Sequence, residues 1–465
     1  AISALADEER LVLGEFRPDG VQREWCDVNV LRQLRRRSLA VLRKEVEPVE
    51  QDAFARFLPQ WHSIPAERRG LEALVDAVGM LAGAPIVAST LERDVLPSRL
   101  VGYSPATLDE LCTSGEVVWT GAGAIGGRDG RIRLCFADQI GLLAPGWEVG
   151  EPPDGEIHAA LRALLAERGA SFWGAFREAA PSANDTELLV ALWDLVWAGE
   201  VTNDTLAPLR ALLAGGGVTG SKRPSRRSGG RPRPGRLTRL GPPAGAGRWS
   251  LVRPLVEPAP TPTEAAHAQA LQLLERHGVI TREAVLAEGV QGGYASVYGV
   301  LKVLEERGRA RRGYFVAGLG AAQFALPGAV ERLRATRDAV DVELDADRAP
   351  APVVLAATDP AQPYGAALAW PDTAGRPARS ANALVVLRQG TPLVWFDRRS
   401  HHLVMFPGGA ADDAWAGALG GLVTNGRERS VEVRKLDGGA VSDEVASVLR
   451  DAGFVDGYRG LVVRG

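Results

Sequence analysis

The sequence predicts an α+β protein: tandem winged-helix modules followed by a C-terminal β-rich module, which we expect to be a small barrel. Two observations carry this prediction, a recurring helix–glycine–strand pattern and a run of short β-rich segments after residue 350. Leucines three residues apart share a helix face, a glycine four residues later suits a left-handed helix end, and an apolar residue two further on begins a strand. This is the second half of a winged helix-turn-helix, and its repetition indicates an array.

The pattern occurs three times with identical offsets and once in weaker form. The copies are Leu108, Leu111, Gly115 and Val117; Leu192, Leu195, Gly199 and Val201; Leu301, Leu304, Gly308 and Ala310; and the weaker Ala446, Leu449, Gly453 and Val455. A single copy would carry little weight, because helix–glycine–strand occurs in any α+β protein. Only the copy within Ser296–Phe315 joins its helix to an arginine cluster, so we expect that module to contact nucleic acid. The other two are expected to act as scaffold or subunit interface.

Bulk properties indicate a soluble, multi-domain protein of a reducing compartment. The chain has 465 residues, is 46% apolar and 24% charged, and has a formal net charge of -3, values typical of a globular protein of about three domains. Its 3 cysteines form no CxxC pair, which favours unpaired thiols in the cytoplasm. We found no apolar window long enough to span a membrane and no signal peptide. Ala1 is not a start methionine, which fits a fragment of a longer protein.

The expected boundaries follow from the repeats and from shifts in composition. They are an N-terminal strand and basic helix over 1–50, winged helices over 51–150 and 151–214, a disordered basic linker over 215–248, a third winged helix over 249–340 and the β-barrel module over 350–465. In the barrel module we expect strands at Val353–Ala357, Ala383–Leu387, Thr391–Phe396, His402–Phe406, Ser430–Leu436 and Gly460–Arg464, with one helix at Val441–Ala452.

Basic residues concentrate in three places that are candidates for nucleic-acid binding. The third module carries Arg307, Arg309, Arg311 and Arg312 where a wing would touch phosphates, with Tyr298 and Lys302 on the preceding helix. The predicted helix Val28–Val46 carries Arg35 and Arg36 on its polar side, and the linker carries Arg226 and Arg227 among 9 basic residues and no acid between Lys222 and Arg248. A solvated or salt-bridged helix face and a linker kept soluble by charge are the alternatives for the last two.

Two further patterns, a glycine-rich segment and a pair of tryptophans, are expected to serve the fold and not to bind a ligand. Gly121-Ala-Gly123-Ala-Ile-Gly126 matches the glycine spacing of dinucleotide sites, but those sites need a following helix whose amides face the pyrophosphate. An alternating strand follows here, so we expect the glycine-rich wing of a winged helix. Trp193 and Trp197, four residues apart on an apolar helix face, are interpreted as core rather than as base-stacking residues. Histidines and cysteines show no metal-ligand spacing, and no metal site is expected.

Four long stretches resemble the Lhr (large helicase-related) DNA helicases in the part beyond their motor. They are EWCDVNVLRQLRRRSLAVLRKEVEPV, ALWDLVWAGEVTNDTLAPLRALL, RRGYFVAGLGAAQFALPGAVERLR and LAATDPAQPYGAALAWP, at 24–49, 191–213, 311–334 and 355–371. The resemblance spans nearly the whole chain. It implies the C-terminal region of a bacterial Lhr protein, with tandem winged helices ending in a β-barrel module.

In that family the motor is an ATP-driven 3′-to-5′ DNA translocase that unwinds RNA–DNA and DNA duplexes, and the C-terminal region is linked to homotetramer formation. The sequence contains no G-x4-G-K-[ST] phosphate loop and no DEAH-type box, so ATP and Mg²⁺ would belong to a motor outside it and we expect no cofactor here. The implied partners are single-stranded or tailed DNA, RNA–DNA hybrid through the parent helicase, and further copies of the chain, with no membrane. The implied location is the cytoplasm, associated with the nucleoid.

A second resemblance concerns chemistry. The winged-helix and barrel layout is similar to that of AlkZ-type DNA glycosylases, and uracil glycosylase activity is attributed to a member of the Lhr family. Such enzymes need a carboxylate or glutamine beside a flipped base. The Gln-x-Gln motif of the AlkZ-like group is absent, and Asp359 and then Gln323 are the candidates in this sequence. The alternative for Asp359 is a turn residue before Pro360. Three hypotheses thus stand: a binding and oligomerisation module, a DNA glycosylase domain, and an array that binds only protein.

Overall fold

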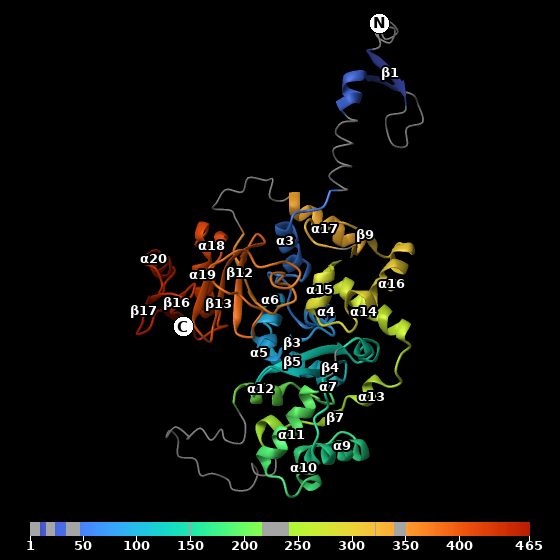
Figure 1. Ribbon diagram of the computed structural model, residues 1–465, viewed down its shortest axis with the longest axis vertical. Helices are drawn as coiled ribbons and strands as arrows, with labels where there is room; N and C mark the ends of the chain where they lie inside the picture. Colours follow the sequence, from blue (N-terminus) through green and yellow to red (C-terminus); the bar gives the residue numbers. More distant parts are fainter. Residues whose placement is uncertain are drawn as a thin grey trace.

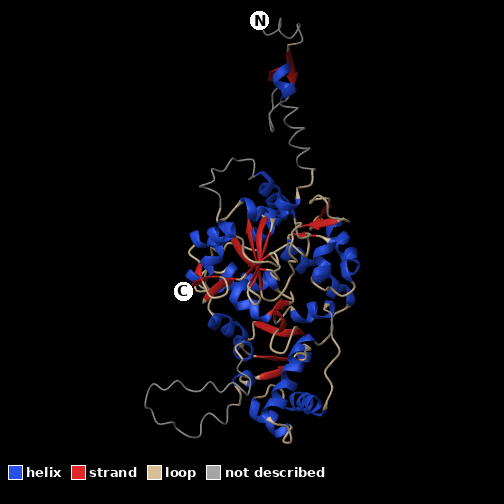
Figure 2. Cartoon of the chain, turned by 60° about the vertical axis from the view of Figure 1, so that its left-hand side comes forward, coloured by secondary structure: helices blue, strands red, loops and turns tan. Residues whose placement is uncertain are grey.

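A computed structural model gives the arrangement of the chain (Figure 1). The structure describes residues 10–14, 24–33, 47–147, 150–215, 241–320, 322–338 and 350–465. Three helical modules and a C-terminal sheet module form the body of the molecule. A hairpin of β1 (Leu11–Gly14) and β2 (Glu24–Asp27) stands away from that body at the N-terminal end (Figure 2).

The first module is a three-stranded wing sheet covered by helices. Its elements are α4 (Leu71–Leu81), β3 (Ile86–Val87), α5 (Ala88–Thr90), a π-helical turn at Leu91–Val95, α6 (Leu96–Arg99), α7 (Pro105–Ser114), β4 (Val117–Ala124) and β5 (Gly130–Phe136). Gly115 ends α7 at a φ of 81°, as the repeat predicts. The strand order is β3-β5-β4. Trp119, Ile132 and Leu134 are buried in the core, so one face of this sheet faces the helices.

The glycines of the GxGxxG pattern lie on the β4–β5 hairpin, as predicted for a wing. A Cβ on Gly121 would lie 1.8 Å from the carbonyl oxygen of Val196, and one on Gly130 would lie 2.5 Å from the ring of Trp197. Glycine is therefore required because α11 of the second module crosses the hairpin at backbone contact distance. This close approach, rather than a phosphate, accounts for Gly121.

The second module has three helices, then a strand, a fourth helix and a second strand that pairs with the first. They are α9 (Glu156–Arg168), α10 (Trp173–Ala179), α11 (Asp185–Trp197), β6 (Val201–Asn203), α12 (Ala207–Leu213) and β7 (Trp249–Leu251). Trp193 and Trp197 are buried, which confirms their core role. Strand β7 pairs with β6, and the indole N–H of Trp193 donates to the Ala244 carbonyl at 2.9 Å. Residues 241–251 therefore pack with the second module, whereas the sequence assigns 241–248 to the disordered linker and 249–251 to the third winged helix.

The third module repeats the topology of the first. It comprises α13 (Arg253–Val256), α14 (Pro262–His277), β8 (Val279–Ile280), α15 (Arg282–Ala287), α16 (Gly293–Glu306), β9 (Arg311–Gly313) and β10 (Gln323–Ala325). The strand order β8-β10-β9 corresponds to β3-β5-β4. Thr261 caps α14 with a reciprocal Glu264 bond, which fixes where the helix begins. Gly308 has a φ of 69°, so a left-handed glycine again follows the repeat helix.

Helix α3 (Gln51–Trp61) and α17 (Pro327–Asp338) connect the third module to the C-terminal sheet. The Thr336 hydroxyl donates to the Ala53 carbonyl at 3.0 Å. Val49 pairs with Val316 as an isolated parallel bridge. Phe54, Phe57 and Leu58 are buried in a core shared with this sheet. The chain segment before the first wing sheet is thus packed between two later modules.

The C-terminal module is an open sheet, and the predicted β-barrel was wrong. The strands β11 (Val353–Ala356), β12 (Ala383–Arg388), β13 (Thr391–Asp397), β14 (His402–Met405) and β16 (Lys435–Leu436) lie side by side, and β11 and β16 form its two edges. Val385 and Leu387 face the core shared with α3, whereas Leu384 and Val386 face α19 (Ala414–Thr424). A sheet with apolar residues on both faces is covered on both sides instead of closing on itself.

The remaining elements cover the second face of that sheet. They are α18 (Pro407–Ala411), α20 (Asp443–Asp451) and a small sheet of β15 (Ser430–Val433), β18 (Leu461–Arg464) and β17 (Val455–Asp456). We expected one helix here, and α18 and α19 were missed. The weak fourth repeat has the predicted form, with Gly453 at a φ of 89° between α20 and β17. Among the described residues, no helix is both long and apolar enough to cross a membrane.

Candidate nucleic-acid interface

Helix α16 occupies the recognition-helix position of the third module, and its two faces differ. Val297, Leu301 and Leu304 are buried in the core of the module. The opposite, exposed face consists of Ala295, Gly299, Lys302, Val303 and Glu306. A Cβ on Gly299 would meet no atom within 4 Å. The part of this face around Ala295 and Gly299 therefore lacks bulky side chains that would hold a nucleic-acid groove away from the helix.

The arginine cluster follows this helix directly. Arg307, Arg309, Arg311 and Arg312 are all exposed, on the turn after α16 and on β9. Arg311 forms an ion pair with Glu331 at 2.7 Å, and both side chains are about half exposed, so the pair contributes little to stability. Within the described part of the chain the other three arginines have no ion-pair partner. The structure thus brings together the four cations that the sequence placed on the wing.

Tyr298 and Lys302 occupy different environments. Lys302 is on the exposed face of α16, beside the arginine cluster. Tyr298 is half-buried, with its ring 5.8 Å from that of Tyr294 and 5.8 Å from that of Phe324. Burial, together with Tyr298, raises the pKa of Tyr294 to about 12. Tyr298 therefore packs the helix onto the wing, and Lys302 is the helix residue available to a ligand. Arg35, Arg36, Arg226 and Arg227 lie outside the described residues.

Gln323 is a packing residue of the wing and is fully buried. Its side-chain oxygen accepts from the backbone N–H groups of Phe315 and Val316, each at 2.9 Å. Its amide nitrogen donates to the Val316 carbonyl at 2.9 Å. Both ends of the amide are engaged, and the side chain has no exposed surface. Gln323 therefore holds the returning wing segment in place and offers nothing to a substrate.

Asp359 is likewise fully buried, at the point where the first module meets the C-terminal module. Its carboxylate is held by both terminal nitrogens of Arg99, at 2.6 and 2.8 Å. One oxygen also accepts from the Ala361 backbone N–H at 2.8 Å. Arg99 in turn lies 2.9 Å from Nδ1 of His62. The carboxylate joins two modules and, in this structure, cannot reach a flipped base.

A second buried carboxylate joins the same two modules. Asp94, in the π-helical turn, is 1% exposed and is bound by Arg398 at 2.7 Å and Arg427 at 3.2 Å. Burial opposes its ionisation, but Arg398, Arg93 and Arg427 together keep its pKa below the usual value. Removing either partner of such a pair leaves an uncompensated buried charge. The contacts therefore fix the C-terminal sheet against the first module.

The third module is fixed to the first by Arg276. This buried side chain pairs with Glu288 and donates to the Ala82 carbonyl at the end of α4. Glu288 also lies 2.6 Å from Nε2 of His277. Although burial opposes ionisation, Arg276 and His277 lower the pKa of Glu288 to about 2. Burial, and then the charges of Arg99, His277 and Arg276, hold the pKa of His62 well below its usual 6.5.

The low pKa of His62 predicts a loss of stability in mild acid. The folded state keeps His62 neutral, whereas the unfolded chain binds a proton below about pH 6.5. Above about pH 6.5 His62 is neutral in both states and costs no stability. Below about pH 6.5 the free energy of unfolding therefore falls as the pH falls, by up to about 1.4 kcal/mol per pH unit. Urea unfolding of the full chain between pH 7.5 and 5 measures this slope. In His62→Gln the slope should flatten, and a wild-type chain equally stable at both pH values would contradict the assignment.

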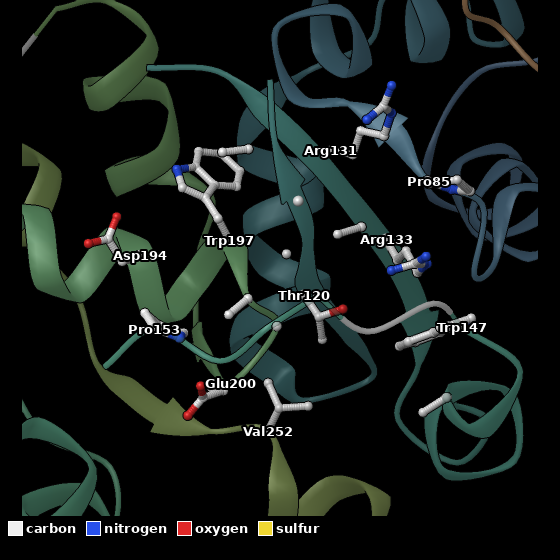
Figure 3. Close-up of a pocket in the computed structure, with 18 of the residues that line it drawn as sticks. Pro85, Thr120, Arg131, Arg133, Trp147, Pro153, Asp194, Trp197, Glu200 and Val252 are labelled. Atoms are coloured by element: carbon white, nitrogen blue, oxygen red, sulfur yellow. The ribbon is translucent and has the colours of Figure 1, made fainter. Parts of the chain in front are cut away.

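A large cleft of about 1080 Å³ lies between the three helical modules (Figure 3). Arg131, Arg133 and Thr120 of the first wing sheet line one side, and Asp194 and Trp197 of α11 line the other. Val252, Arg253, Val256 and Ala287–Gly289 close it from the third module's side. Sequence reasoning missed this cleft, because its walls come from segments far apart in the chain. The only available signal was the glycine-rich wing that borders it.

Together these features define a multi-module winged-helix protein with a basic wing on its third module. Comparison with known proteins identifies the family. Residues 259–344 and 49–137 each match a family model described as large helicase-related protein, winged-helix domain. The chain belongs to the large helicase-related (Lhr) family.

Two curated relatives give the extent of the match. The chain is 45% identical, over its whole length, to 31% of "Lhr helicase/ probable uracil glycosylase" from Mycolicibacterium smegmatis. It is 34% identical, over 80% of its length, to 26% of "Lhr helicase/uracil glycosylase" from Escherichia coli. The chain thus spans about a third or less of these relatives. Streptomyces sahachiroi DNA glycosylase AlkZ is a structural neighbour with a TM-score of 0.45 and 14% identity, covering 78% of this chain and 92% of that one.

Proposed function

We propose that this chain is the nucleic-acid-binding part of an Lhr helicase, and that its third winged helix makes the main contact with the phosphate backbone. The observation that carries the proposal is the exposed cluster of Arg307, Arg309 and Arg312 beside the open face of α16. At the repeat position of Arg309 the other two modules have acids, Glu116 and Glu200. Arginines on phosphates release counterions and drive binding, so the three modules are not equivalent in this role.

The direct test is a titration of the full chain with single-stranded and tailed DNA over a range of salt. We expect the logarithm of the affinity to fall linearly with the logarithm of the salt concentration. Absence of binding even at low salt would overturn the proposal and favour the array that binds only protein.

Helicase activity is proposed for the parent protein rather than for this part of it. Both relatives are named helicases, and the chain covers 31% and 26% of them. We propose that the parent chain translocates 3′-to-5′ with ATP and Mg²⁺ bound to a motor outside these residues, and that it acts at the nucleoid. The sequence has no phosphate-loop motif, so the isolated chain is proposed not to hydrolyse ATP. DNA-stimulated phosphate release by the isolated chain would contradict this.

Self-association, expected to give a homotetramer, is supported by the N-terminal hairpin. Val12, Leu13 and Trp25 on β1 and β2 are each about 40% exposed or more. A two-stranded hairpin is marginally stable by itself, and a second copy of the chain would bury these exposed apolar side chains. Light scattering at micromolar concentration tests this, since a monomer would count against it.

Uracil excision is a second candidate, because both relatives are also named as uracil glycosylases. Asp359 and Gln323 are too deeply buried to serve it. Among the carboxylates that line the large cleft, Asp194 is about half exposed and lies 3.2 Å from Nε2 of His158, whereas Glu200 is already engaged by Arg162. Incubation with uracil-containing single strands followed by alkali tests the activity, and Asp194→Asn tests the residue. Uncleaved strands would remove this candidate.

A further inference from the structure

The outer face of the first wing sheet carries polar residues at one end, next to a small apolar cluster that includes Cys135 and Val118. Alternate residues of a strand point to opposite faces, so Thr120, Arg131 and Arg133 point away from the core that holds Trp119 and Ile132. Thr120 and Arg133 are direct cross-strand partners. This polar end is one wall of the 1080 Å³ cleft (Figure 3). A wing whose outer face is hydrophilic and hollowed at one end is suited to hold a ligand.

Three groups on this wall point to an anionic, aromatic ligand. The Thr120 hydroxyl is buried and has no hydrogen-bond partner, a state that is costly unless a ligand or water supplies one. Arg131 is exposed and, within the described part of the chain, has no ion-pair partner. The Arg133 guanidinium lies 4.7 Å from the ring centre of Trp147. A cation, a hydroxyl and a stacked arginine–tryptophan pair are thus found together on one face.

The facing wall carries two carboxylates, Asp194 and Glu200, beside the guanidinium of Arg162. Asp194 and Glu200 lie across the cleft from Arg131 and Arg133 (Figure 3). Glu200 is held by Arg162 at 2.5 Å and Asp194 by His158 at 3.2 Å, so these acids are fixed in orientation. Carboxylates accept hydrogen bonds from the exocyclic amino groups of bases. The two walls therefore suit the two ends of a nucleotide, phosphate on one side and base edge on the other.

We propose that this cleft binds one unpaired nucleotide of a nucleic-acid strand, with its phosphate on Arg131, the face of its base on the Arg133–Trp147 pair beside the Thr120 hydroxyl, and the edge of its base toward Asp194 and Glu200. The inference rests on the proposed function, because it presumes that the chain binds nucleic acid. The cleft is of the size that encloses small-molecule ligands, roughly 300–1,000 Å³. A base must leave its stack to enter, and bases stack on aromatic rings and arginine planes. The site thus selects single-stranded or locally opened nucleic acid.

The test uses the full chain and a single strand that carries 2-aminopurine at one position. The emission of this base falls when it stacks, and a fluorescein-labelled copy of the strand reports total affinity. The wild-type chain should quench the 2-aminopurine on binding. Arg131→Gln and Thr120→Val should each lose most of the quenching while total affinity falls by no more than about tenfold. Thr120→Ser, which keeps the hydroxyl, should retain the quenching.

Arg128→Gln is the matched control, because Arg128 is an exposed arginine on the same hairpin that does not line the cleft. It should behave as wild type. If the strand binds but its 2-aminopurine is not quenched, or if Arg131→Gln and Arg128→Gln behave alike, the nucleotide site is wrong while the proposed function stands. If no strand binds at low salt, the proposed function fails first. Each variant should give the circular dichroism spectrum of the wild type, so that lost quenching does not result from unfolding.

Discussion

Replacing Asp359 with alanine is expected to lower the free energy of unfolding by about 3–5 kcal/mol. The reason is that Arg99, whose side chain is only 2% exposed, would lose its partner at 2.6 Å and keep its charge inside the protein. Asp372→Ala removes an exposed carboxylate of the same module and should change stability by less than about 0.5 kcal/mol. Urea unfolding followed by circular dichroism measures both.

The double substitution Asp359→Ala with Arg99→Met separates the cost of an unpaired buried charge from the cost of lost side-chain packing. Once the arginine is replaced by an apolar side chain, most of the stability should return, because the buried charge of Arg99 is no longer left without its partner. A single Asp359→Ala variant as stable as wild type would contradict the buried pair. The prediction also bears on chemistry, since an Asp359→Ala variant without glycosylase activity would report unfolding rather than catalysis.

Replacing Arg309 and Arg312 together with glutamine is expected to weaken binding to tailed DNA and to make it less sensitive to salt. Each phosphate contact contributes about 0.7–0.9 to the slope of log affinity against log salt, so two lost contacts should reduce the slope by about 1.4–1.8. At about 0.2 M salt this corresponds to a loss of at least tenfold in affinity. Fluorescence anisotropy at four salt concentrations gives both values.

The matched control is the double variant Arg376→Gln and Arg399→Gln. These arginines are exposed on the C-terminal module, and their loss changes the net charge by the same amount. The control should keep the wild-type slope. Equal slopes for the two double variants would mean that the third wing does not hold the phosphates.

The local parts of the fold could be predicted because they depend on residues close in sequence. The offsets of the repeat placed Gly115, Gly199, Gly308 and Gly453 correctly as left-handed residues between a helix and a strand. The strands after residue 350 were also found near their predicted positions, except that the predicted strand Ser430–Leu436 forms two strands, β15 and β16, in different sheets. The prediction that these strands close into a barrel was wrong. The alternation of apolar residues cannot show whether other elements cover both faces of an open sheet. Helix α19, AWAGALGGLVT, was missed because its glycines have a low helix propensity and weaken the helix signal of the segment.

The candidate site was predicted only where its residues are neighbours in the chain. Arg307, Arg309, Arg311 and Arg312 lie within one turn and one strand, so the sequence could group them. Asp359 meets an arginine 260 positions earlier, and the turn pattern around Pro360 gives no sign of that partner. The cleft beside the first wing could not be predicted for the same reason, because its charged walls belong to different modules.

Photocrosslinking from equivalent positions of the three repeat helices tests the central claim most directly. Ala106, Val190 and Gly299 stand two residues before the first leucine of their repeats, and all three are exposed. A photoreactive side chain is placed at each position in turn, and the chain is irradiated with tailed DNA at moderate salt. We predict a crosslink from position 299 and none from 106 or 190. Crosslinks from 106 or 190 without one from 299 would show that another module holds the DNA.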